Sequence, residues 1–165
     1  MAADDPIERL RALVGEATFD GRFDLVRDAG VGGMGRVIEA VDRHRDRRVA
    51  IKLIDGRGLA DLQRFAAEAE ILERLAHPRI VGYVAHGTTG RGDPYLAMEW
   101  LDGETLAERL RRGRLDVDAT LALARQLADA LAYAHGQGVV HRDLKPSNVM
   151  LVGAAIDDAR LLDFG

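Results

Sequence analysis

The 165-residue sequence contains no cysteine. This absence excludes a disulfide-stapled scaffold and a zinc site with cysteine ligands, and it favours the reducing cytoplasm, where we expect this protein. No apolar run approaches the roughly 20 residues that a membrane-spanning helix needs, so we expect no membrane segment. The 27 acidic and 23 basic residues give a net charge of −4, which provides no electrostatic reason to expect a nucleic-acid partner.

Lysine, asparagine and serine are also scarce. Only two of the 23 basic residues are lysines, Lys52 and Lys145, and all the others are arginines. Asn148 is the only asparagine and Ser147 the only serine. Because arginine cannot replace lysine where a compact point charge is required, the two lysine positions are the first candidates for chemistry.

Hydrophobic residues make up 47% of the chain, which is enough to bury a core. Apolar runs bounded by turn residues predict strands at 23–26, 37–41, 48–54, 80–85 and 95–99. A helix is predicted over 59–76, where apolar residues recur at spacings of three and four. Further helices are predicted at 105–111 and 116–135, and short strands at 149–152 and 160–162.

This order of elements predicts an α+β fold in which a sheet-rich lobe precedes a helical lobe. We expect a leader over 1–20 with a short amphipathic helix, the first lobe over 21–101 and the second over 102–165. The longer helix is expected to carry one apolar face, formed by Val117, Thr120, Leu121, Ala124, Leu127, Ala128 and Leu131.

A G-x-G-x-x-G-x-V pattern follows the first predicted strand and consists of Gly30, Val31, Gly32, Gly33, Met34, Gly35, Arg36 and Val37. Glycines in such a loop let backbone N–H groups approach a polyphosphate. A dinucleotide-binding turn has a similar pattern, but it leads into a helix. Because a strand, a charged turn and another strand follow here, we favour a strand–loop–strand hairpin and keep the dinucleotide turn as the alternative.

The third predicted strand ends in V-A-I-K, which places Lys52 where it could pair with phosphate oxygens. The alternative is an ordinary lysine at a strand end. In the helix that follows, Glu68 adjoins the apolar stripe at Phe65 and Ala69, whereas Glu70 and Glu73 are expected in solvent. Glu68 is therefore the carboxylate that we expect to face inward.

The string H-R-D-L-K-P-S-N over 141–148 carries the strongest chemical signal. Asp143 could accept a proton from a hydroxyl group, Lys145 could neutralise a transferring phosphate, and Asn148 could bind Mg²⁺ through its amide oxygen. The sequence ends in D-F-G, and the carboxylate of Asp163 could bridge Mg²⁺ to phosphate.

Together, these motifs resemble the protein kinase family, in the family's order and over 23–165. The G-G-M-G run is similar to bacterial serine/threonine kinases of the eukaryotic-like type. The resemblance implies a five-stranded antiparallel lobe with one helix, followed by the first part of a mainly helical lobe. It also implies phosphorylation of serine and threonine hydroxyl groups, with ATP and Mg²⁺ as cofactors and a protein as substrate.

The resemblance also assigns roles to individual residues. The loop at 30–37 would cover the ATP phosphates, and Lys52 would contact the α and β phosphates and pair with Glu68. The resemblance places other residues around adenine: Val37, Ala40 and Ala50 as its lining, Met98 as gatekeeper, and Glu99 and Leu101 as hinge positions.

In the second lobe, Asp143 would be the catalytic base and Lys145 a phosphate contact, with Asn148 and Asp163 as Mg²⁺ ligands. Both lysines of the chain thus stand where the family uses lysine. If lysine and arginine were exchangeable, that coincidence would arise roughly once in 250 random placements.

The sequence departs from the family pattern in three ways. It stops at Gly165, before the activation segment, so we expect a truncated catalytic domain with Leu121, Leu127 and Leu131 partly uncovered. Ile38 replaces a common aromatic residue, and Arg79 stands where asparagine is common after His77-Pro78.

Two other functions remain open. A catalytically incomplete nucleotide-binding or regulatory module would also keep these motifs. A small-molecule phosphotransferase of similar fold is disfavoured by the L-K-P string at 144–146.

Overall fold

The computed structural model describes residues 21–32, 35–53 and 59–164. The expected leader helix, Gly33 and Met34 therefore lie outside the described residues. The chain divides into two compact units, which we describe separately. The first unit holds the residues up to Ala69 together with Tyr83–Trp100, and the second holds Glu70–Gly82 and the residues from Leu101 onward.

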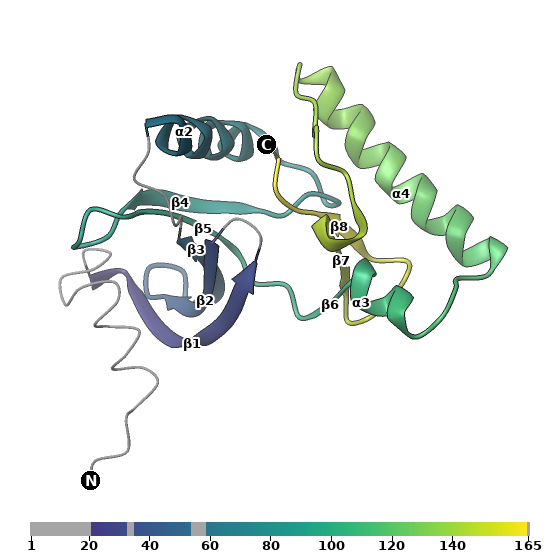
Figure 1. Ribbon diagram of the computed structural model, residues 1–165, viewed down its shortest axis with the longest axis horizontal. Helices are drawn as coiled ribbons and strands as arrows, with labels where there is room; N and C mark the ends of the chain where they lie inside the picture. Colours follow the sequence, from purple (N-terminus) through teal and green to yellow (C-terminus); the bar gives the residue numbers. More distant parts are fainter. Residues whose placement is uncertain (1–20, 33–34, 54–58, 165) are drawn as a thin grey trace, which may run out of the picture. The chain divides into compact units, whose positions relative to one another are not determined.

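The first unit is built on a five-stranded sheet with the spatial order β1-β2-β3-β5-β4 (Figure 1). Every pair of neighbouring strands is antiparallel. The helix α2 runs alongside this sheet, which confirms the predicted five strands and one helix. The elements are β1 (Phe23–Gly32), β2 (Gly35–Asp42), β3 (Arg47–Leu53), α2 (Leu59–Arg74), β4 (Tyr83–Thr88) and β5 (Pro94–Glu99).

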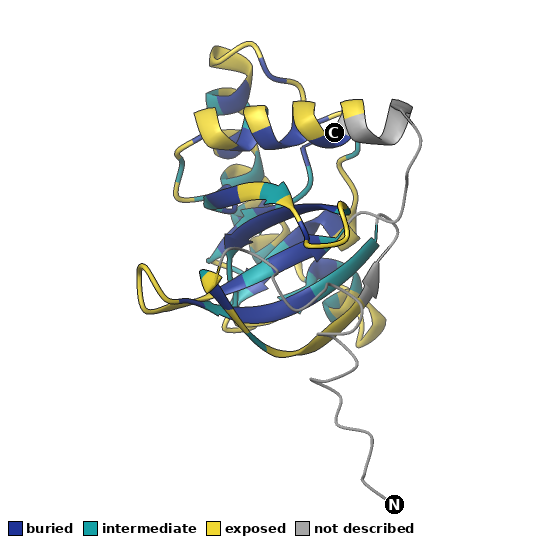
Figure 2. Ribbon diagram, turned by 90° about the vertical axis from the view of Figure 1, so that its left-hand side faces the viewer, coloured by how far each residue is buried: buried dark blue, intermediate teal, exposed yellow. Residues whose placement is uncertain are grey.

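One face of the sheet forms a hydrophobic core because side chains alternate between the two faces of each strand. The core consists of Phe23, Ile38, Ala40, Val49, Ile51, Val84, Ala85, Tyr95 and Ala97. Figure 2 shows this burial as dark blue along the strands, with exposed residues at a hairpin tip. The rings of Phe23 and Tyr95 meet edge to face, with centroids 6.1 Å apart.

Ala40 and Ala50 were both expected to line the adenine pocket, but the structure places Ala40 on the other face of the sheet. Ala40 pairs with Val49 across β2 and β3 and is fully buried in the hydrophobic core. Because Val49 and Ala50 are consecutive residues of a strand, their side chains point to opposite faces. Ala40 therefore lies on the core face and Ala50 on the other.

The start of β1 is fixed to the end of β2 by an arginine–carboxylate pair. Asp42 is fully buried, and Arg22 donates two hydrogen bonds to its oxygens, of 2.8 and 3.1 Å. The backbone N–H of His44 adds a third hydrogen bond of 3.0 Å. The hydrogen bond from Arg22 is the main reason that the pKa of Asp42 lies below its ordinary value.

The second unit combines a three-stranded sheet, in the order β6-β7-β8, with helices. Its elements are β6 (Gly103–Thr105), α3 (Leu106–Arg111), α4 (Val117–Gly136), the 3₁₀ turn η2 (Pro146–Asn148), β7 (Val149–Val152) and β8 (Ala159–Leu161). The structure thus adds a strand, β6, that is absent from the predicted elements. A Cβ atom at Gly103 would lie 2.0 Å from the Leu151 carbonyl oxygen, so this pairing requires glycine.

Both helices of the second unit begin at side-chain caps. Thr105 and Glu108 form a reciprocal capping box before α3. Asp116 accepts a 2.7 Å hydrogen bond from the Ala119 N–H at the start of α4. The predicted helices are confirmed, with starts shifted by one residue because these residues are caps.

The apolar face predicted for α4 is only partly covered, as expected for Leu121, Leu127 and Leu131. The buried residues of this helix are Leu123, Ala130 and Ala134, whereas Val117 is 73% and Leu121 49% exposed. Apolar residues occur around most of the helix, so its sequence contains two overlapping stripes at helical spacing. Among the helices in the described part of the chain, none combines the length and apolar character needed to cross a membrane.

The run predicted as a single strand at 80–85 is divided between the two units. Ile80 forms a parallel bridge to Leu161 of β8, and the regular strand β4 begins only at Tyr83. The sequence of a continuous apolar run does not show where its pairing changes from one strand to another, because the residues on both sides of the change are buried. The bridge at Ile80 connects the α2–β4 loop to the strand that leads to Asp163.

Candidate active site

A buried ion pair joins β3 to α2 in the first unit. The Nζ atom of Lys52 lies 3.0 Å from Oε1 of Glu68, and the two side chains are only 5% and 8% exposed. Glu70 and Glu73 are exposed, as predicted, so one carboxylate of the three faces inward. Phe65, Ala69 and Leu72 are buried on the same helix.

The glycine-rich loop is a hairpin, as favoured from the sequence. Gly32 pairs with Gly35, and β2 rather than a helix follows, which removes the dinucleotide alternative. Gly30 and Gly35 have φ values of +123° and +127°, which residues with a side chain rarely adopt. The Gly30 N–H donates a 2.9 Å hydrogen bond to Asp28, whose other oxygen pairs with Arg36.

The face of the sheet opposite the core collects the residues expected around adenine. Val37 pairs with Lys52, and Ala50 pairs with Met98 across neighbouring strands. Residues paired in this way project from the same face, and Ala50 and Lys52 share a face because they are two residues apart. The register therefore places Val37, Ala50, Lys52 and Met98 on one face.

The chain leaves this sheet through Glu99, Trp100 and Leu101. Glu99 is the last residue of β5 and pairs with Val49. The Trp100 N–H donates to the Arg48 carbonyl oxygen over 3.4 Å, which extends the link to β3 by one residue. The division between the two units falls after Trp100, so Leu101 begins the next segment of the second unit.

A cluster of charged and aromatic side chains surrounds Trp100, and the sequence analysis missed it. Glu39 is buried and accepts from Arg27 over 2.7 Å and from Arg48 over 3.4 Å. The guanidinium carbons of Arg27 and Arg48 lie 5.3 and 5.9 Å from the Trp100 ring centroid. A glutamate within the apolar run 37–41 was the signal that could have revealed this cluster.

In the second unit, two candidate catalytic side chains contact the carboxylate of a third. Lys145 Nζ lies 2.5 Å from Oδ2 of Asp143, and Asn148 Nδ2 donates to the same oxygen over 3.2 Å. Asn148 also donates to the Asp143 carbonyl oxygen over 2.9 Å. The hydrogen bond from Lys145 is the main reason that the pKa of Asp143 lies below its ordinary value. This carboxylate is therefore ionised at neutral pH.

Asp163 lies directly after residues that are fixed to this loop. The Leu162 N–H donates to the Asn148 carbonyl oxygen over 2.9 Å, and the Leu162 carbonyl oxygen contacts His141 Nε2 at 2.8 Å. The fully buried ring of Phe164 packs on the His141 ring, with centroids 4.6 Å apart. These contacts hold both neighbours of Asp163.

Two residues of this region have unusual backbone conformations. Arg142 and Asp163 have φ values of +64° and +49°, in the left-handed region that residues with a side chain seldom occupy. Such conformations persist only where the surroundings enforce them, and they concentrate at functional sites. Arg142 precedes Asp143, so both strained positions adjoin or carry a candidate catalytic carboxylate.

The donor set fits a magnesium ion. The Asn148 amide uses its nitrogen to contact Asp143, which leaves its oxygen as the atom to bind a cation. Asp163 supplies a carboxylate next to the residue that contacts the Asn148 backbone. Mg²⁺ prefers such oxygen ligands and commonly takes only one or two from protein, with phosphate and water completing its coordination.

The chain matches the model of the protein kinase domain over residues 23–165. This chain belongs to the protein kinase family. It is 41% identical over 150 residues to serine/threonine-protein kinase pkn2 of Myxococcus xanthus, covering 88% of this chain and 18% of that kinase. It is 39% identical to the Mycobacterium tuberculosis kinase PknA, covering 90% of this chain and 36% of PknA.

Solved kinase structures agree with this family and with the α+β fold. The kinase domain of M. tuberculosis PknI matches with a TM-score of 0.77 and 31% identity, over 87% of this chain and 58% of that one. A structure of Rad53 in complex with AMP-PNP matches with a TM-score of 0.72 and 29% identity, over 87% of this chain and 38% of that one. The resemblance found in the motifs, including the bacterial serine/threonine type, is confirmed.

Proposed function

We propose that this protein transfers the γ-phosphate of ATP to serine and threonine hydroxyl groups of protein substrates, with Mg²⁺ as the metal ion. The observation that carries the proposal is the contact of Lys145 and Asn148 with the ionised carboxylate of Asp143. A base, a phosphate-binding cation and a metal-binding amide are the groups that phosphoryl transfer to a hydroxyl requires.

In this proposal, Asp143 accepts the proton of the attacking hydroxyl group and orients its oxygen. Lys145 is half exposed, so its ammonium group can leave Asp143 for a phosphate oxygen without breaking a packed core. Asn148 and Asp163 hold Mg²⁺, which neutralises charge on the phosphates when it is bound. The strained backbone at Asp163 directs its carboxylate.

The first unit would bind the nucleotide. The buried contact with Glu68 fixes Lys52, so its ammonium group meets the α and β phosphates at a defined place. The hairpin at 30–37 covers the phosphates with backbone N–H groups. Ala50 and Met98 line the adenine pocket below Val37, and the backbone of Glu99 and Leu101 hydrogen-bonds adenine.

Specificity for serine and threonine rests on the relatives, which are serine/threonine kinases, and on Lys145 within the catalytic loop. The chain spans 18% and 36% of two of these relatives, so their substrates are not carried over individually. A cytoplasmic location belongs to the same proposal, because ATP and reduced protein substrates are available there.

The test is transfer of labelled γ-phosphate from Mg-ATP to the protein itself and to a generic serine- and threonine-containing protein. We expect Asp143→Asn to lower the rate at least about 100-fold, the contribution of a general base. Asp118→Asn, which changes an exposed aspartate in the first turn of α4, is the matched control and retains the rate.

Equal rates in Asp143→Asn and the wild type would refute the role of Asp143. If the wild type itself transfers no phosphate but still binds Mg-ATP, the protein is a nucleotide-binding module and not an active kinase.

A further inference from the structure

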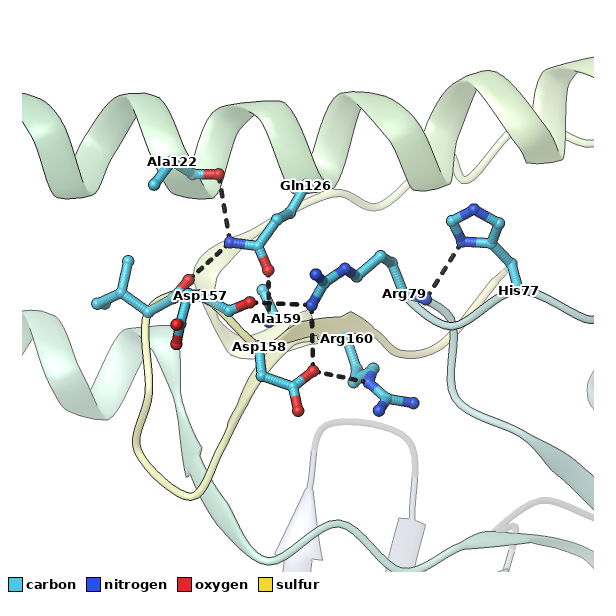
Figure 3. Close-up of polar contacts among 9 residues, drawn as sticks. His77, Arg79, Ala122, Gln126, Asp157, Asp158, Ala159 and Arg160 are labelled. Atoms are coloured by element: carbon cyan, nitrogen blue, oxygen red, sulfur yellow. Dashed lines mark hydrogen bonds and ion pairs between the residues drawn. The ribbon is translucent and has the colours of Figure 1, made fainter.

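Arg79, one of the departures from the family pattern, holds the β7–β8 turn (Figure 3). Its Nη1 atom donates to the Asp157 carbonyl oxygen over 3.0 Å and to Oδ1 of Asp158 over 3.2 Å. The backbone N–H of Arg79 donates to His77 Nδ1 over 3.2 Å, which fixes the start of the side chain. Arg79 thus links the α2–β4 loop to a turn almost 80 residues further along the chain.

The backbone of the same loop is paired with β8. The Leu161 N–H donates to the Arg79 carbonyl oxygen over 2.8 Å, and the Val81 N–H donates to the Leu161 carbonyl oxygen over 2.9 Å. Arg79 therefore contacts β8 at Leu161 through its backbone and the turn before β8 through its side chain. Two such contacts define both the register and the direction of a three-residue strand.

Gln126 of α4 holds this turn from another element. Its Nε2 atom donates to the Ile156 carbonyl oxygen over 2.8 Å, and its Oε1 atom accepts from the Ala159 N–H over 3.0 Å. One planar amide thus bridges the residues on either side of Asp157 and Asp158, as Figure 3 shows for Ala159. The amide can make both bonds only while the turn is closed.

Asp163 lies two residues after β8, with a φ of +49° that requires support from its surroundings. The contacts of Asn148 and His141 to Leu162 hold the chain next to Asp163, and the register of β8 decides where Leu162 arrives. Residues that orient a metal ligand commonly change metal affinity when they are replaced. A displaced β8 would therefore displace the carboxylate of Asp163.

We propose that Arg79 and Gln126 are positioning residues for Asp163, which hold β8 in the register that presents this carboxylate to the metal–nucleotide complex. The proposal rests on the proposed function, because that function makes Asp163 a metal ligand. It assigns to Arg79, in place of the usual asparagine, a defined task in this chain.

Arg160 provides a matched control within the same cluster. Its Nε atom donates to Oδ1 of Asp158 over 3.1 Å, so Arg79 and Arg160 share one carboxylate oxygen. Arg160 belongs to β8, whereas Arg79 reaches the turn from a different segment. The Arg79–Asp158 contact joins the turn before β8 to the α2–β4 loop, whereas the Arg160–Asp158 contact joins this turn to β8 itself.

The experiment is a calorimetric titration of the full chain with ADP at increasing MgCl₂ concentrations. We expect Arg79→Gln and Gln126→Leu each to raise the half-saturating Mg²⁺ concentration about tenfold. ADP affinity without Mg²⁺ should stay unchanged in both variants. Arg160→Gln should stay within about twofold of the wild type, because its contact with Asp158 is partly exposed and does not reach the α2–β4 loop. Arg79→Lys, which keeps one cationic donor, should recover part of the loss.

An equal shift in Arg79→Gln and Arg160→Gln, or no shift in either, would overturn the proposal. If the wild type binds no nucleotide, the proposed function fails, and hydrogen exchange then decides the positioning role. The Leu161 and Leu162 amides should exchange faster in Arg79→Gln than in Arg160→Gln. Equal exchange rates in the two variants would refute that role as well.

Discussion

Each of the two units holds one lysine–carboxylate pair, and the two pairs differ in how far they are exposed to solvent. The Lys52–Glu68 pair is almost completely buried, with side chains 5% and 8% exposed. The Lys145–Asp143 pair is 50% and 43% exposed, and its atoms are closer, at 2.5 Å. The first pair therefore contributes to the packing of its unit, whereas the second is accessible to substrate.

This difference separates what each lysine must do. A buried ammonium group is costly without its partner, so Lys52 and Glu68 depend on each other for stability. An exposed pair adds little to stability, so the proposed roles of Lys145 and Asp143 in phosphate transfer need not compete with a role in the fold. The two lysines of this arginine-rich chain therefore stand in two different physical settings.

The largest expected effect comes from breaking the buried pair. Glu68→Ala should lower the free energy of unfolding by about 3–5 kcal/mol, because it removes the carboxylate that lies 3.0 Å from the buried Lys52 ammonium group. Urea denaturation measures the change. Glu70→Ala, two residues further along the same helix and exposed, should stay within about 0.5 kcal/mol of the wild type. A similar result for both variants would mean that the ion pair is not buried in solution.

The exposed Lys145–Asp143 pair adds little to stability, so we expect the buried side chains of α4 to contribute more to the stability of the second unit. Leu123→Ala should cost about 2–5 kcal/mol, since Leu123 is one of the buried residues of α4. Leu121→Ala, at a position 49% exposed, should change stability by no more than about 0.5 kcal/mol. The reverse ranking in thermal or urea unfolding would contradict the burial that the structure gives these two leucines.

Conservative replacement of each lysine sharpens the comparison further. Lys52→Arg should destabilise the protein by about 1–3 kcal/mol, because the larger guanidinium overpacks a site that is closed to solvent. Lys145→Arg should leave the unfolding midpoint unchanged but slow phosphate transfer, because a planar guanidinium replaces a compact ammonium group. Parallel urea and transfer assays check both. A loss of stability in Lys145→Arg with normal phosphate transfer would contradict the assignment of a structural role to Lys52 and a chemical role to Lys145.

The smallest effect concerns acid stability. Asp42 has a lowered pKa, so its pairing with Arg22 stabilises the fold fully above the unfolded-state pKa of about 3.9. This contribution disappears as the pH falls through the lower folded-state pKa. Arg22→Gln should therefore cost about 1.5 kcal/mol at pH 7 and progressively less below pH of about 4. Urea titrations across this pH range would contradict the prediction if the difference stayed constant.

Much of the fold was predictable because local patterns and long-range contacts agree. Turn residues bound each strand of the first sheet, and the apolar stripe of α2 selects Glu68 from three glutamates. The glycine-rich pattern was correctly interpreted as a hairpin because a strand, and not a helix, is predicted directly after it. Asp143, Lys145, Asn148 and Asp163 were quoted from sequence motifs, because a motif directly shows which chemical groups are present.

The sequence was uninformative where two apolar patterns fit equally well and only the packing partner in the fold decides which residues are buried. The helix α4 carries two apolar stripes, and periodicity alone selects neither Leu121 nor Leu123. Ile80 and Val84 belong to one apolar run but are assigned to different units. The contacts of Arg79 and Gln126 could not be predicted either, because they join segments whose proximity depends on the complete fold.

The arginine cluster around Trp100 has a practical consequence. Trp100 is the only tryptophan of the chain, and it stands between the two positions expected to hydrogen-bond adenine. Its ring lies near two guanidinium groups that a buried carboxylate holds in place. Indole emission is sensitive to nearby charge, so a small displacement of Glu99 or Leu101 would alter it. The protein thus carries an intrinsic optical probe, with which the proposed nucleotide binding can be tested without any attached label.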